Sequence, residues 1–94
     1  MADKDAYVQK LHAKIDEWDA EIDKLKAKAG QAEADVQVNY NKELENLKVK
    51  RREAGKKLEE VRQAGEGAWE DIKAGAQSAM KALETALKSA KSRF

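Results

Sequence analysis

The sequence predicts an all-α fold, and three observations indicate it. Apolar residues recur at alternating steps of three and four across residues 8–36, the heptad period with which a helix buries a narrow stripe against another helix. The chain has no proline, 39% of its residues are charged, and alanine, lysine and glutamate, which favour helices, are abundant. Gly65 and Gly67 give the strongest turn signal. We therefore expect one helical coiled-coil domain over residues 1–94.

The apolar stripe, which we call the interaction seam, continues past residue 36 with one irregularity. The step from Val36 to Tyr40 is four residues where three was due, and such a stutter relaxes a supercoil without ending a helix. The sequence therefore predicts one helix over about residues 4–63, followed by a C-terminal helix over about residues 68–92 that folds back. The seam residues expected to carry the contacts are Val8, Leu11, Ile15, Trp18, Ile22, Leu25, Leu44, Leu47, Arg51, Leu58 and Val61.

The charge distribution favours antiparallel pairing of the two halves of the long helix. Residues 1–37 carry six basic and nine acidic side chains, whereas residues 38–66 carry eight and six. When positions whose numbers sum to 69 are paired, seam residues oppose one another, and Arg51 opposes Trp18. The expected assembly is an antiparallel coiled-coil homodimer in which the C-terminal helix covers the groove between the paired halves.

Two other arrangements stay open on the sequence alone. A turn near residues 30–40, where Gly30, Asn39 and Asn41 are candidate breaks, gives a monomeric three-helix bundle with the same antiparallel contacts. A parallel dimer suits the β-branched seam residues of the first half, but it places Arg51 against its own copy.

The C-terminal helix is the main candidate for binding outside the chain. Its apolar stripe and flanking basic residues are typical of a helix that lies on an anionic lipid surface, a granule or an apolar partner protein. The alternative, which we favour, is that the stripe packs on the other helices, because acidic residues interrupt the basic face. The candidate surface-binding residues are Trp69, Ile72, Met80, Leu83, Leu87 and Phe94.

Two further features are weaker candidates. Residues 48–57 hold six positive charges in ten, but no aromatic residue lies between them to stack on bases, so nucleic acid is not expected as a partner. His12 and Asp16 share a helix face at the spacing of metal ligands, but the chain has one histidine and no cysteine. We expect no metal site, no cofactor and no catalytic set.

The chain resembles short bacterial coiled-coil proteins with no assigned activity. The likeness lies in residues 5–11 (DAYVQKL), 17–25 (EWDAEIDKL) and 68–75 (AWEDIKAG) and in the ending KSRF. The resemblance implies a small soluble helical protein and brings no site residues with it. The N-terminal residues show no signal-peptide pattern, so the cytoplasm is the expected location. The expected function is non-enzymatic self-association in a structural or adaptor role, and surface binding through residues 68–94 is the alternative.

Overall fold

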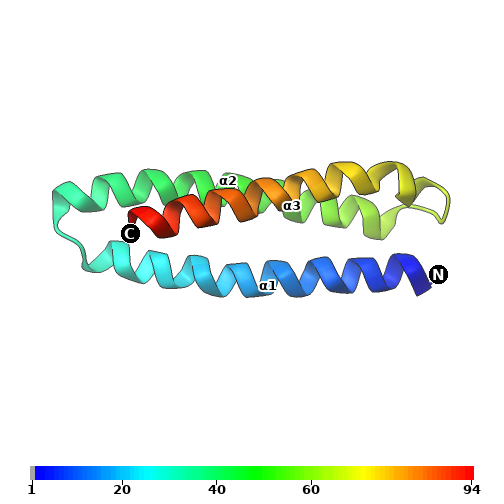
Figure 1. Cartoon of the computed structure of the whole chain (residues 1–94), viewed down its shortest axis with the longest axis horizontal. Coiled ribbons are helices and arrows are strands. Elements are labelled where there is room, and N and C mark those ends of the chain that lie inside the picture. The colour runs from blue at the N-terminus through cyan, green and yellow to red at the C-terminus, as the bar shows by residue number, and fades with distance from the viewer. Residues whose placement is uncertain (1) are drawn as a thin grey trace.

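The computed structural model describes residues 2–94 and shows three α-helices with no strand in that range. They are α1 (Ala2–Gln31), α2 (Ala34–Gln63) and α3 (Ala68–Arg93). Successive helices run in opposite directions along the long axis, so that α2 is antiparallel to both α1 and α3 (Figure 1). The molecule measures 51 × 18 × 17 Å, which is about one 30-residue helix in length. The all-α prediction is confirmed, and the arrangement is the three-helix bundle.

The prediction of one helix over residues 4–63 is wrong, because the chain reverses at Ala32 and Glu33. Glu33 has an extended backbone, with φ −64° and ψ 156°. The amide of Gln37 donates from Nε2 to the carbonyl oxygen of Ala29 at 3.1 Å across the reversal. No residue in the range 2–94 has a positive φ, and the chain has no proline. Of the candidate breaks, Gly30 lies in the last turn of α1, next to the reversal, whereas Asn39 and Asn41 lie inside α2. The reversal lets α1 bury its seam inside its own chain, without the entropy cost of association.

The antiparallel register expected from the charges is present between α1 and α2. The guanidinium of Arg51 donates from Nε and Nη2 to the two carboxylate oxygens of Asp19, at 2.7 and 3.2 Å. Lys4 donates from Nζ to the carbonyl oxygens of Arg62 and Ala64, at 3.1 and 2.8 Å. The residue numbers of these pairs add up to values between 66 and 70, close to the expected 69.

The C-terminal helix, α3, begins and ends within one residue of its predicted bounds. It packs in the groove between α1 and α2. Its contact with α2 is the most extensive in the bundle, and its contact with α1 is the smallest. Leu47 and Val61 of α2 and Leu83 of α3 are the largest fully buried side chains among the described residues. One continuous core therefore runs the length of the bundle, with side chains from all three helices.

Candidate interaction site

The interaction seam is the best candidate for a functional surface, and the bundle already uses most of it. Eight of its eleven residues are buried: Leu11, Ile15, Ile22, Leu25, Leu44, Leu47, Leu58 and Val61. Val8, Trp18 and Arg51 are partly exposed. The structure therefore brings the seam residues together between helices of one chain.

Trp18 and Arg51 do not form the pair that their positions indicated. The Arg51 guanidinium turns toward Asp19, and it lies so close over Gly55 that a Cβ atom added there would be 2.6 Å from Nη1. Trp18 instead lines a groove between α1 and α3, and Met80 and Lys14 are among the other residues that line it. The tryptophan thus packs toward the third helix, whose position the heptad pattern of the first half cannot specify.

The candidate surface-binding residues of α3 also face the core. Trp69, Met80, Leu83 and Leu87 are buried, and Ile72 and Phe94 are partly buried against the same cluster. In the closed bundle this stripe is therefore covered by α1 and α2.

An aromatic cluster fixes the end of the bundle near the start of α1. The rings of Tyr7 and Trp69 lie with their centroids 5.7 Å apart, and the ammonium of Lys73 is 5.2 Å from the first centroid and 5.4 Å from the second. The Tyr7 hydroxyl is buried with no hydrogen-bond partner among the described residues. Burial raises the pKa of Tyr7, and the Gln77 side chain lowers it by a smaller amount, because its polar group lies near the hydroxyl without reaching the geometry of a hydrogen bond.

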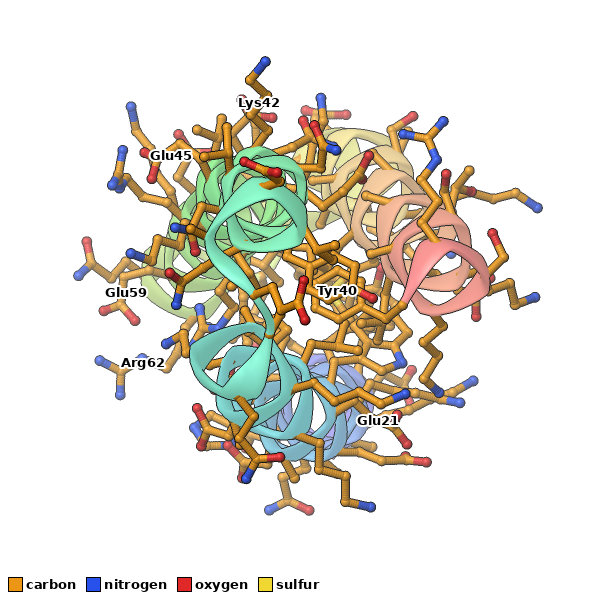
Figure 2. All side chains as sticks on the ribbon, turned by 90° about the vertical axis from the view of Figure 1, so that its left-hand side faces the viewer. Glu21, Tyr40, Lys42, Glu45, Glu59 and Arg62 are labelled. Carbon is orange, nitrogen blue, oxygen red and sulfur yellow. The ribbon has the colours of Figure 1, made fainter. Side chains whose placement is uncertain are left out.

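A second cluster closes the opposite end. The rings of Tyr40 and Phe94 stack with centroids 4.0 Å apart and planes at 14°, and Arg93 forms an ion pair with Glu43 beside them. Figure 2, viewed from the end with the α1–α2 connection, shows Tyr40 pointing into the space between the helices, whereas Lys42 points outward. Aromatic pairs therefore link α1 with α3 at one end of the bundle and α2 with α3 at the other.

An ion pair also joins α1 to α3, the least extensive helix contact. Lys91 Nζ lies 2.5 Å from Glu21 Oε2, and this hydrogen bond holds the pKa of Glu21 below its ordinary value. Both side chains are partly exposed, so water screens the pair and its contribution to stability is small.

The two weaker candidates, the His12–Asp16 pair and the basic residues 48–57, do not gather into a binding site among the described residues. His12 Nδ1 lies 3.2 Å from Asp16 Oδ2 on an exposed face of α1. No group of three or more metal-ligating side chains gathers anywhere in residues 2–94. In the basic run, Arg51 is paired with Asp19, and Lys57 Nζ lies 3.3 Å from Glu60 Oε2. Over the same residues, no helix is both long enough and apolar enough to cross a membrane.

Three large apolar side chains of α2 are exposed, and only one of them, Val36, was considered from the sequence. Val36, Val38 and Val49 of α2 are 41%, 56% and 37% exposed. Val38 and Val49 are eleven residues apart, a spacing that returns to nearly the same side of a helix, and this side faces away from the core. Val36 differs from these two because it belongs to the seam pattern yet is not buried by the bundle.

The fold thus defines a small antiparallel three-helix bundle whose recognisable surfaces are helical packing faces. Comparison of the chain with protein-family models, curated proteins and solved structures gives no match.

Proposed function

We propose that this protein is a non-enzymatic, self-associating coiled-coil protein with a structural or adaptor role, of the kind found among short bacterial coiled-coil proteins. The observation that supports the proposal is the α1–α2 seam. Its antiparallel register is held by apolar layers and by the bidentate Arg51–Asp19 pair, and nothing in those contacts requires the two helices to belong to one chain.

The proposed assembly is an antiparallel homodimer. Each copy carries the same acidic first helix and basic second helix, so two copies are complementary when they run in opposite directions. Packing of apolar seam residues supplies the affinity, and the charged flanks select the direction.

The test is the solution mass, measured by light scattering over a hundredfold range of protein concentration. We expect the mass to rise from that of one chain, 10.5 kDa, toward twice that value. A single-chain mass throughout the range would reject self-association.

Two variants test whether the seam residues form the contact that raises the solution mass. Ile22→Asp places a charge at a position that is 5% exposed, and it should remove both the helical circular-dichroism signal and the dimer. Val38→Asp adds the same charge at a position that is 56% exposed, and it should leave both unchanged. Dimers of normal stability in Ile22→Asp would show that the seam is not the contact.

A further inference from the structure

The connection between α1 and α2 has the composition and geometry of a hinge. It consists of Ala32 and Glu33 alone, and the side chain of Glu33 makes no capping hydrogen bond to the start of α2. Alanine and glutamate are strong helix formers, as is Gln31 before them. Changing the backbone of these two residues to helical values is enough to join α1 and α2 into one continuous helix.

The contacts across the hinge are symmetrical in sequence. The pairs Lys4–Arg62 and Ala29–Gln37 have residue numbers that add up to 66, and Asp19–Arg51 adds up to 70. A set of pairs with a nearly constant sum of about 68 is symmetrical about residue 34. Two straightened chains that cross at a two-fold axis near that residue therefore form the Lys4–Arg62 and Asp19–Arg51 pairs between chains.

Straightening also lets the backbone groups at the reversal form regular helix bonds. In the closed bundle the carbonyl oxygen of Ala29 accepts from the Ala32 N–H at 3.2 Å and from Gln37 Nε2 at 3.1 Å. A continuous helix instead pairs the last carbonyls of α1 with the first amides of α2. Val36, a seam position that is 41% exposed in the bundle, falls near the axis, where a second copy covers it. These gains act against the entropy lost on association, so the balance depends on concentration.

We propose that two copies of this chain dimerise by exchanging α1 through straightening at Ala32 and Glu33. The inference rests on the proposed self-association and names its mechanism. In each half of the dimer, α1 of one copy occupies the groove between α2 and α3 of the other, with the aromatic and ionic contacts of the closed bundle kept.

The substitution Ala34→Pro separates the closed bundle from the exchanged dimer. Residue 34 is the first residue of α2, where proline is well accepted, and Glu33 before it already has the extended backbone that proline requires. In a continuous helix the same proline removes the hydrogen bond to residue 30 and clashes with the preceding turn. We expect the dimer dissociation constant to rise by at least about a hundredfold, with the helical content of the bundle unchanged. Ala34→Ser, which is compatible with both forms, is the matched control.

Comparing dimerisation of the three chains tests the exchange of α1 separately from self-association. Dimers in the natural chain and in Ala34→Ser, with monomers in Ala34→Pro, support the exchange. Equal dimerisation of all three chains overturns the exchange and leaves self-association through another surface. Monomers in all three overturn both proposals.

A second measurement covers the case in which Ala34→Pro does not fold. Small-angle X-ray scattering of the natural dimer should give a rod about 90 Å long, because some 60 residues of continuous helix rise about 1.5 Å each. A dimer no longer than the 51 Å bundle consists of closed bundles side by side and overturns the exchange.

Discussion

At the scale of single residues, the bundle holds its polar groups near the surface, and Tyr7 is the exception within the described chain. The ring of Tyr7 makes favourable contacts, because it packs on Trp69 and faces the ammonium of Lys73. The hydroxyl, however, has lost its contact with water and has no hydrogen-bond partner among the described residues. An unpaired buried hydroxyl costs free energy that the ring contacts must offset.

We expect Tyr7→Phe to raise the free energy of unfolding by about 1 kcal/mol, because it removes the unpaired hydroxyl and keeps the ring. Urea denaturation followed by circular dichroism measures the change. The advantage should grow above pH 10, because burial raises the pKa of Tyr7 in the folded state and the unfolded state then loses the proton first. Tyr40→Phe, at the stacked pair with Phe94, is the control and should give no such gain. A loss of stability in Tyr7→Phe would show that the hydroxyl is hydrogen-bonded in solution.

At the scale of the elements, the three helix contacts differ in strength. The contact of α3 with α2 is extensive, whereas α1 and α3 meet over a smaller area and are joined by the Glu21–Lys91 ion pair. An element held by less contact opens at lower free-energy cost.

Because of the Glu21–Lys91 pair, we expect the protein to lose stability in acid. Because the pKa of Glu21 is lowered in the folded state, its contribution is complete above its ordinary value of 4.5 and is lost as the pH falls through the lowered value. Unfolding by urea from pH 7 to pH 3 should therefore show a smaller pH dependence in Glu21→Gln than in the natural chain.

The matched control for this experiment is Glu17→Gln, which removes the same charge from an exposed position of α1. It should retain the pH dependence of the natural chain. Identical pH profiles for the two variants would mean that the pair with Lys91 does not form in solution. The Glu59–Arg62 pair within α2 also lowers a carboxylate pKa, so some acid sensitivity remains in every variant.

At the scale of the whole molecule, the fold depends on one thin core. The bundle is only 18 × 17 Å in cross-section, and its buried side chains form one cluster to which all three helices contribute. Removal of one large core residue should therefore weaken all three helices together, and unfolding should be a single cooperative transition.

Leu83→Ala tests this cooperativity. Leu83 is 0% exposed, and its truncation should lower the free energy of unfolding by about 2–5 kcal/mol through lost burial and a cavity. Circular dichroism and tryptophan fluorescence, which reports on Trp18 in α1 and Trp69 in α3, should give the same midpoint. Val38→Ala, at an exposed position, should change stability by less than about 0.5 kcal/mol. Two separate midpoints in Leu83→Ala would mean that α3 unfolds independently of α1.

Much of the fold could be predicted from local information. The heptad spacing identified the apolar face of α1 and α2, because a residue's position on a helix follows directly from its sequence number. The glycines at 65 and 67 marked the second reversal, and the C-terminal helix was predicted within one residue at its end. The antiparallel register followed from charge complementarity, and the Arg51–Asp19 pair lies within one residue of the expected sum.

The first reversal was left open by the sequence as the alternative turn near residues 30–40 and was not chosen, because Ala32 and Glu33 favour a helix and only tertiary contacts hold them out of one. Tertiary contacts also decided the packing of Trp18 toward α3 and the stacking of Tyr40 on Phe94, which joins residues 54 positions apart. The sequence by itself determined which faces are apolar and which directions pair, because periodicity and charge are local properties. Tertiary structure decided where the chain turns and which helix each face meets, because the burial of three helices in one core outweighs the weak local preference of two residues.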